Sequence, residues 1–332
     1  MSTLLELRDL QVEFDTWDGR VRVIESLSLR LDAGETLCIV GESGCGKSMT
    51  ALAVMGLVPQ PTGHITGGAM LFQGEDLVRA SEGRRREVRG NEISMIFQEP
   101  MTSLNPVYTA GEQIAEALRL HRGLSRGAAQ ARAVEMLRAV RIPEAERRAN
   151  EFPHQFSGGM RQRVMIAIAL ACEPKILIAD EPTTALDVTV QAQIFDLLQD
   201  LREQKGTAII LITHDMGAVA EMADRVIVMY AGRKVEEGRV EDILEHAAHP
   251  YTRGLLACRP QLTLGPSGPR TALAEIPGVV PPLHLLGAGC AFAPRCAQAM
   301  ARCHQVAPRE SQVGAGHTAM CWLLEDRERV PA

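Results

Sequence analysis

Alternating apolar and polar residues near the amino terminus predict a series of β-strands. Residues 5–7, 10–14 and 27–31 alternate in this way, and turn residues separate them. Residues 36–40 form a continuous apolar run, which is typical of a strand buried on both faces of a sheet. The spacing of apolar positions becomes helical over residues 49–57. The pattern therefore predicts an antiparallel β region that leads into an α/β core.

The middle of the chain contains a second α/β pattern and a long helical stretch. Two further apolar runs, residues 176–179 and 208–212, predict buried strands. The helical segment 190–204 between them predicts a parallel βαβ unit. Residues 101–150 have helical spacing and contain no strand candidate. We therefore predict a helical subdomain inserted at about residues 100–165.

Proline and glycine accumulate after about residue 257, which predicts a boundary between residues 1–256 and a loop-rich extension, residues 257–332. The extension contains four cysteines with the spacing C-x5-C-x6-C-x17-C, namely Cys290, Cys296, Cys303 and Cys321. In a chain without an export signal, such a cluster indicates a metal site before it indicates disulfides. The spacing leaves an iron–sulfur cluster, zinc and unliganded thiols open.

The overall composition narrows the possible functions. Of the 332 residues, 46% are hydrophobic and 23% are charged, and the net charge is -6. This acidic balance argues against a dedicated nucleic-acid-binding protein, whose surface is basic, so no nucleic-acid partner is expected. No apolar run reaches the roughly 18 residues of a membrane span, and the amino terminus has no signal-peptide core. We therefore expect a soluble, cytoplasmic protein.

A glycine-rich loop follows the apolar run 36–40 and precedes the helical segment. It fits the pattern G-x-x-x-x-G-K-[ST] and comprises Gly41, Glu42, Ser43, Gly44, Cys45, Gly46, Lys47 and Ser48, with Met49 as the next residue. Between a strand and a helix, the backbone N–H groups of such a loop surround the phosphates of a nucleotide. Lys47 is expected to reach the β- and γ-phosphates, and the Ser48 hydroxyl to coordinate Mg²⁺. The loop therefore predicts binding of ATP with Mg²⁺.

Two adjacent carboxylates, Asp180 and Glu181, follow the apolar run 176–179. Side chains at the carboxyl end of a strand lie where ligands bind in open α/β sheets. Because successive side chains of a strand point in different directions, the two carboxylates can have different roles. We predict that Asp180 supports Mg²⁺ and that Glu181 activates a water molecule as a general base.

A second candidate anion site lies at Ser157, Gly158 and Gly159, ahead of a long apolar helix. The segment 156–163 reads F-S-G-G-M-R-Q-R and resembles the L-S-G-G-Q signature of the ATP-binding subunits of ABC transporters. Phe and Met replace Leu and Gln of that signature, while its Ser-Gly-Gly core is intact. The resemblance covers about residues 4–256. It implies that ATP is held between this chain and a second ATPase subunit, either identical or a paralogue.

Four further positions match the family, and the resemblance implies their roles. Gln98 matches the glutamine that senses Mg²⁺ and the attacking water, and His214 matches the histidine that contacts the γ-phosphate. Asp187 ends an Ala-Leu-Asp segment that resembles the loop crossing the dimer interface. Phe14 fits the aromatic position that stacks on adenine, with Trp17 as the alternative.

Two short segments and the cysteine-rich extension narrow the resemblance to the ATPases of dipeptide and oligopeptide importers. The segments 98–106 and 249–253 read Q-E-P-M-T-S-L-N-P and H-P-Y-T-R. In that family, the resemblance implies a four-iron four-sulfur cluster at the four cysteines. It also implies two separate transmembrane permease subunits docked by the helical subdomain, and an extracytoplasmic substrate-binding protein. The chain would be a peripheral subunit at the cytoplasmic face of the inner membrane.

The resulting fold prediction is an α/β P-loop ABC-type ATPase core with an amino-terminal antiparallel β region, an inserted helical subdomain and a loop-rich, cysteine-containing extension. The predicted function is ATP-driven import of dipeptides or oligopeptides. An importer of nickel or another small solute is the first alternative. A soluble ABC ATPase of DNA repair or translation is the second. It fits less well, because the interval from Lys47 to Ser157 is too short for a long coiled coil and the sequence has one P-loop.

Overall fold

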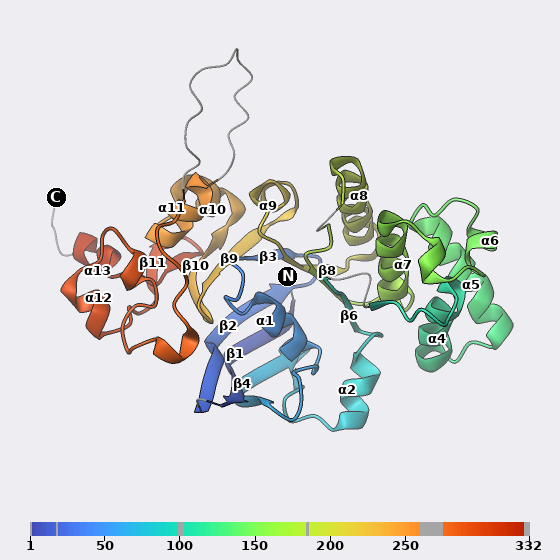
Figure 1. Cartoon of the computed structure of the whole chain (residues 1–332), viewed down its shortest axis with the longest axis horizontal. Coiled ribbons are helices and arrows are strands. Elements are labelled where there is room, and N and C mark those ends of the chain that lie inside the picture. The colour runs from blue at the N-terminus through green and yellow to red at the C-terminus, as the bar shows by residue number, and fades with distance from the viewer. Residues whose placement is uncertain (1, 18, 99–102, 184–185, 259–274, 329–332) are drawn as a thin grey trace, which may run out of the picture.

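Two β-sheets form the framework of the protein (Figure 1). The computed structural model describes residues 2–17, 19–98, 103–183, 186–258 and 275–328. The smaller sheet is antiparallel, in the order β2-β1-β4-β5, and consists of β1 (Thr3–Thr16), β2 (Gly19–Asp32), β4 (Gly63–Phe72) and β5 (Glu75–Asp76). The strands predicted at residues 5–7 and 10–14 are one strand, β1. An irregularity around Asp9, where φ is 47°, shifts the register without ending the pairing with β2.

The larger sheet has the order β11-β12-β10-β9-β3-β8-β7-β6. Its strands are β3 (Thr36–Val40), β6 (Ile93–Ile96), β7 (Ile176–Asp180), β8 (Ala208–Ile212), β9 (Arg225–Tyr230), β10 (Arg233–Arg239), β11 (Ser311–Gly314) and β12 (His317–Ala319). The five strands from β9 to β6 are parallel, and the pairing of β7 with β8 confirms the predicted βαβ unit. The parallel strands end at one edge, the carboxyl edge, and begin at the opposite, amino edge.

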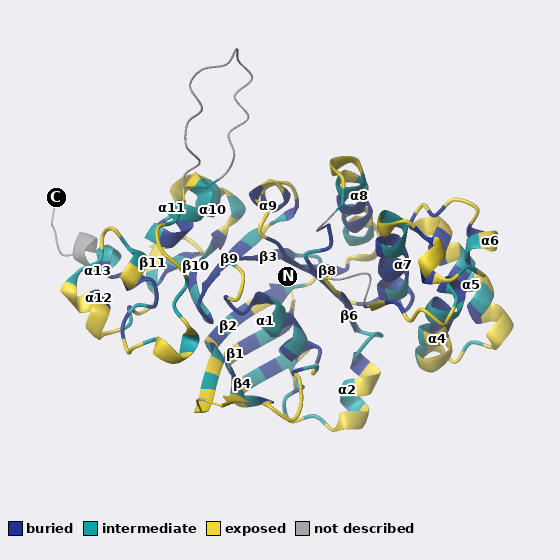
Figure 2. Cartoon of the chain, in the orientation of Figure 1, coloured by how far each residue is buried: buried dark blue, intermediate teal, exposed yellow. Residues whose placement is uncertain are grey.

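Alternate side chains of β3 point into two different hydrophobic clusters. Leu37 and Ile39 pack with buried residues of the antiparallel sheet and α1, whereas Cys38 and Val40 pack with buried residues of α4, α5, α7 and α8. Both faces of the parallel strands are therefore covered, which explains their unbroken apolar runs. Figure 2 shows these strands in the buried colour.

Several of the helices begin at a side-chain cap that the sequence provides. The helices are α1 (Lys47–Val54), α2 (Glu82–Val88), α4 (Ala110–Arg122), α5 (Arg126–Ala139), α6 (Ala145–Arg148), α7 (Gly158–Leu170), α8 (Val188–Lys205), α9 (Met216–Met222), α10 (Val240–His246), α11 (Pro250–Ala257), α12 (Ala301–Gln305) and α13 (Trp322–Glu328). Thr109, Ser125 and Ser157 each accept a backbone N–H at the start of a helix. Helices α4 to α7 lie together in the segment between β6 and β7, on the right of Figure 1.

The carboxy-terminal extension is joined to the sheet, which the prediction of a loop-rich appendage did not foresee. Strand β12 pairs with β10, and β11 pairs with β12. The two strands have 4 and 3 residues, too few to produce a recognisable alternation in the sequence. His317 of β12 also lies 2.8 Å from the buried Glu236 carboxylate of β10. The extension therefore shares the core of the molecule.

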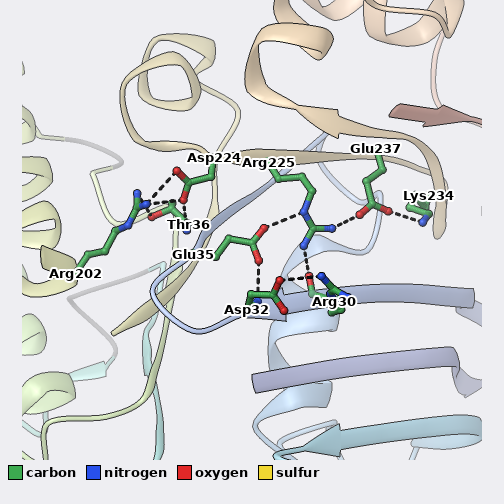
Figure 3. A network of polar contacts seen from close by, with 9 residues as sticks. All are labelled: Arg30, Asp32, Glu35, Thr36, Arg202, Asp224, Arg225, Lys234 and Glu237. Atoms are coloured by element: carbon green, nitrogen blue, oxygen red, sulfur yellow. Dashed lines mark hydrogen bonds and ion pairs between the residues drawn. The ribbon is translucent and has the colours of Figure 1, made fainter. Parts of the chain in front are cut away.

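Charged residues connect five elements at the amino edge of the parallel strands (Figure 3). Arg225, which begins β9, donates to Glu35 at 2.8 Å and to Glu237 and the Arg30 carbonyl. Arg202 of α8 donates to Asp224 at 3.0 Å, and Asp224 in turn accepts the backbone N–H of the first residue of β3 at 2.8 Å. These contacts hold the two sheets and α8 together.

Among the described residues, no helix combines the length and the apolar character that crossing a membrane requires.

Candidate functional site

The glycine-rich loop joins the carboxyl end of β3 to the start of α1, as predicted. Gly41 has a φ of 151°, and a Cβ there would lie 2.2 Å from the Met229 carbonyl oxygen, so the backbone requires glycine. Lys47 is buried, and its ammonium donates to the carbonyl oxygens of Gly41 at 2.6 Å and Glu42 at 3.0 Å. The loop thus closes around the lysine at the start of a helix. This arrangement suits a phosphate group.

Asp180 ends β7 beside this loop and is buried. Burial raises the pKa of Asp180, and a hydrogen bond with Ser48 partly opposes that shift. Its Oδ1 atom has no hydrogen-bond partner. A buried carboxylate oxygen left without a partner, next to the serine of a P-loop, fits a site for Mg²⁺, which takes few protein ligands and keeps substrate oxygens and water.

Glu181 lies between the two other predicted catalytic residues. The Gln98 amide donates to Glu181 Oε2 at 3.0 Å, and His214 Nδ1 lies 3.2 Å from Glu181 Oε1. The three residues follow β6, β7 and β8, which are neighbours in the sheet. Glu181 has a φ of 47°, a conformation that costs energy for a residue with a side chain and concentrates at functional sites. The carboxyl edge therefore brings together residues that are far apart in the sequence.

Ser157, at the start of α7, lies away from the glycine-rich loop in this single chain (Figure 1), and Asp187 lies at the start of α8. Ser157 caps α7 and accepts the Met160 N–H at 3.3 Å, and Asp187 caps α8 and accepts the Val190 N–H at 2.9 Å. Figure 1 shows α7 well to the right of α1. Gly158 has open space around its Cα, so the start of α7 is accessible. Residues 99–102 and 184–185, which belong to two of the family-like segments, lie outside the described residues.

The two candidates for stacking on adenine have different surroundings. Phe14 is half-buried and packs against the amino-terminal hydrophobic cluster, with its ring 2.9 Å from the position of a Cβ on Gly63. Trp17 is fully exposed beside the turn between β1 and β2. Phe14 is therefore engaged in packing, whereas Trp17 is free to contact a ligand. The assignment of Phe14 stays a prediction.

Tyr251 contacts the glycine-rich loop from outside and was not predicted as a site residue. Tyr251 is buried in α11, and its hydroxyl oxygen accepts the Glu42 backbone N–H at 2.8 Å. Burial raises the pKa of Tyr251 well above its ordinary value, so the hydroxyl stays neutral. The H-P-Y-T-R segment contained this residue, but no sequence pattern indicates that it contacts a loop 209 residues away.

The four cysteines of the extension line one small cavity, together with His249 and Trp322. Burial, with a smaller contribution from the other three cysteines, raises the pKa of the Cys321 thiol to about 11. No group of three or more Cys, His or acidic side chains in the described ranges has an arrangement that holds a metal ion. Around one zinc ion the sulfur atoms would lie about 4 Å apart. The donor chemistry fits a metal site, but the arrangement of the thiols does not fit a single ion.

Two family models match the sequence. Residues 24–184 match the ABC transporter model, and residues 235–303 match the model of the oligopeptide/dipeptide transporter C-terminal region. A solved dimeric structure of the ATP-binding cassette MJ0796 bound to ADP and Pi is 31% identical to this chain, with a TM-score of 0.64. It matches over 71% of this chain and 99% of that one.

Relatives that match nearly the whole chain identify a narrower family within the ABC transporter ATPases. The probable peptide ABC transporter ATP-binding protein y4tR of Sinorhizobium fredii is 52% identical, over 96% of this chain and 94% of its own. The oligopeptide transport ATP-binding protein OppD of Bacillus subtilis is 53% identical, over 98% of this chain and 90% of its own. These relatives are about one half identical to the chain over nearly its whole length. The chain therefore belongs to the family of ATP-binding subunits of peptide ABC importers and is an ATP-hydrolysing transport subunit.

Proposed function

We propose that this subunit binds and hydrolyses ATP at the carboxyl edge of the parallel strands, with Glu181 as the general base. The arrangement of Gln98, Glu181 and His214 carries the proposal, because two polar groups fix the orientation of one carboxylate. That carboxylate lies next to Asp180, whose free oxygen and contact with Ser48 suit a cation. General bases must be held at a defined position to take a proton from water.

Each residue of this site then has a distinct task. Lys47 and the loop N–H groups hold the phosphates, while Ser48, Asp180 and Gln98 would hold Mg²⁺. When bound, Mg²⁺ neutralises charge on the phosphate oxygens. Glu181 accepts a proton from the attacking water, and His214 orients Glu181 and the γ-phosphate.

The second anion motif is proposed to act on ATP bound by another ATPase subunit. Ser157, Gly158 and Gly159 open α7 at an accessible helix start, and Asp187 caps the next helix. Because the start of α7 is distant from α1 in one chain, a second copy or a paralogue must bring it to the phosphates (Figure 1). The solved structure of the similar ATP-binding cassette MJ0796 is dimeric, which supports this arrangement.

We further propose that the helices between β6 and β7 form the subdomain that docks two transmembrane permease subunits. Val107, Tyr108 and Leu120 in this segment are large apolar side chains that are exposed to solvent. Scattered exposed apolar residues are ordinary, but they fit a surface that is covered in the assembled transporter. The subunit would lie at the cytoplasmic face of the inner membrane. An extracytoplasmic substrate-binding protein would deliver peptide to the permease.

A four-iron four-sulfur cluster is the proposed occupant of the cysteine cavity. The Met300 backbone N–H donates to the sulfur atom of Cys303 at 3.5 Å, and hydrogen bonds to the sulfur atoms are common around such clusters. A cluster also accepts thiolates that are farther apart than the ligands of one ion. About four irons and four sulfides per chain after anaerobic purification, lost in Cys296→Ser, would support the cluster. Stoichiometric zinc, or no metal, would reject it.

Measuring uptake by cells tests which solute the transporter carries. In cells that lack this chain, wild-type protein should restore uptake of a labelled tripeptide, and Lys47→Ala should not. Uptake of ⁶³Ni²⁺ in the same cells serves as the control. Restored nickel uptake without peptide uptake would replace peptide by nickel as the substrate.

A further inference from the structure

One arginine of the cysteine-rich extension reaches the nucleotide-binding loop. Arg295 ends a short 3-10 turn (Ala293–Arg295), directly before Cys296. Its two terminal nitrogens lie 2.6 Å and 3.0 Å from the two carboxylate oxygens of Glu42. Glu42 is the second residue of the glycine-rich loop, 253 residues earlier in the chain. The contact is bidentate, which is the strongest arrangement of this pair of groups.

The guanidinium of Arg295 is the fixed partner in this pair. Its side chain is only 4% exposed, whereas that of Glu42 is 30% exposed. Arg295 also donates to the carbonyl oxygens of Pro277 at 2.9 Å and Ile276 at 3.1 Å. The ring centroids of Tyr230 and Phe292 lie 5.8 Å and 5.9 Å from the guanidinium carbon. These contacts hold the guanidinium in place independently of the loop.

Glu42 joins the extension to the lysine of the loop. Its carboxylate binds Arg295, its backbone N–H donates to the Tyr251 hydroxyl, and its carbonyl oxygen accepts the Lys47 ammonium at 3.0 Å. A shift of Glu42 would therefore move the carbonyl that holds Lys47. Glu42 itself need not contact the nucleotide for this to happen.

We propose that Arg295 is a positioning residue for ATP: through Glu42, the carboxy-terminal extension keeps the first turn of the glycine-rich loop in the shape that binds phosphate. The inference rests on the proposed role of the loop and adds the extension as part of the ATP site. It also implies that a change in the cysteine-rich segment next to Arg295 alters affinity for ATP.

Positioning and plain structural support predict different kinetics. A loop that holds the phosphates equally in the ground state and the transition state affects KM and leaves kcat unchanged. Arg295→Ala should therefore weaken ATP binding and raise KM by about five- to thirtyfold, with kcat within about twofold. This is less than the roughly ten- to hundredfold effect of losing a charged hydrogen bond made directly to the ligand, because Arg295 acts through Glu42. Glu42→Ala should have a similar effect and leaves the interior of the extension intact.

A double-mutant cycle tests whether Arg295 acts through Glu42. The dissociation constant for a fluorescent ATP analogue is measured for Arg295→Ala, Glu42→Ala and the double variant. The double variant should bind no more weakly than the weaker of the single variants, because each removes the same contact. Effects that multiply, or an unchanged affinity in Glu42→Ala, would overturn the proposal, and the second result does so even if Arg295→Ala fails to fold.

Two further variants distinguish a positioning role of Arg295 from a general effect of the extension and from failure of the loop assignment itself. Arg302→Ala is the matched control, since Arg302 also precedes a cysteine and contacts an aromatic ring, that of Trp322, but does so away from the loop. It should leave ATP affinity unchanged. Lys47→Ala tests the loop itself. If Lys47→Ala loses binding while Arg295→Ala and Glu42→Ala keep it, the loop assignment stands and the positioning role fails. An equal loss of affinity in Arg302→Ala would also contradict the role of Arg295.

Discussion

The two edges of the parallel sheet use charged residues in opposite ways. At the amino edge, Arg225 contacts Glu35, Glu237 and a backbone carbonyl, and these contacts join elements from both sheets (Figure 3). At the carboxyl edge, Asp180 keeps an oxygen without a partner, and Glu181 has a backbone conformation that is costly. The charged residues at the amino edge stabilise the fold, whereas charged groups at the carboxyl edge keep atoms available for a ligand.

This difference shows why charge alone does not identify a site. Both edges contain buried or half-buried acidic groups, and both lie at the ends of apolar strands. The two edges differ in whether each charged group already has its hydrogen bonds and ion pairs with neighbouring residues. Arg295 is an intermediate case, because its guanidinium is buried and hydrogen-bonded like that of Arg225 but contacts a loop that we propose binds ATP.

Glu181→Gln should produce the largest effect at the carboxyl edge. Replacing the general base should lower ATP hydrolysis by about 10² to 10⁴-fold, while ATP binding is kept, because the amide cannot accept the proton. Steady-state hydrolysis and binding of a fluorescent ATP analogue measure the two effects separately. Turnover near that of the wild type would remove Glu181 from this role.

Arg225→Ala should have the corresponding effect at the amino edge, on stability alone. Removing it leaves the carboxylates of Glu35 and Glu237 without their shared partner, which should cost roughly 3 kcal/mol of the free energy of unfolding. Denaturation with urea measures this loss. The KM for ATP should stay the same at a temperature where the variant is folded, and a raised KM would break the distinction between the edges.

Lys47→Ala should lower ATP affinity by about ten- to a hundredfold, which is the usual worth of a hydrogen bond from a charged donor. The melting temperature should change little, since the hydrogen bonds of the ammonium within the described part of the chain are to atoms of the loop itself. Titration with ATP and a thermal melt of the same preparation check both parts. Unchanged affinity would contradict the role of the glycine-rich loop.

Acid should weaken the amino edge by a smaller amount. Burial by itself would raise the pKa of Glu92, but its hydrogen bonds to Lys175 and Arg84 outweigh burial and hold the pKa below the ordinary 4.5. Its stabilising contribution is therefore present above about pH 4.5 and is lost as the pH falls through the lowered pKa. The effect should stay below about 1 kcal/mol because the pair is partly exposed. Glu92→Gln should make the melting temperature less sensitive to acid, and an unchanged pH profile would contradict this.

The sequence predicted the carboxyl edge better than it predicted the extension, for physical reasons. Lys47, Asp180 and Glu181 lie in short patterns attached to apolar runs, and His214 follows another such run, so chain order alone places them at strand ends. The contact between Glu42 and Arg295 spans 253 residues and has no local pattern. Strands β11 and β12 are too short and polar to be recognised.

Amide hydrogen exchange with and without a non-hydrolysable ATP analogue and Mg²⁺ tests the central claim most directly, because it locates the ligand on the chain. We expect increased protection over residues 41–49 and around Asp180, with no change around Arg225 at the amino edge. Protection at the amino edge alone, or none over residues 41–49 at saturating analogue, would contradict it.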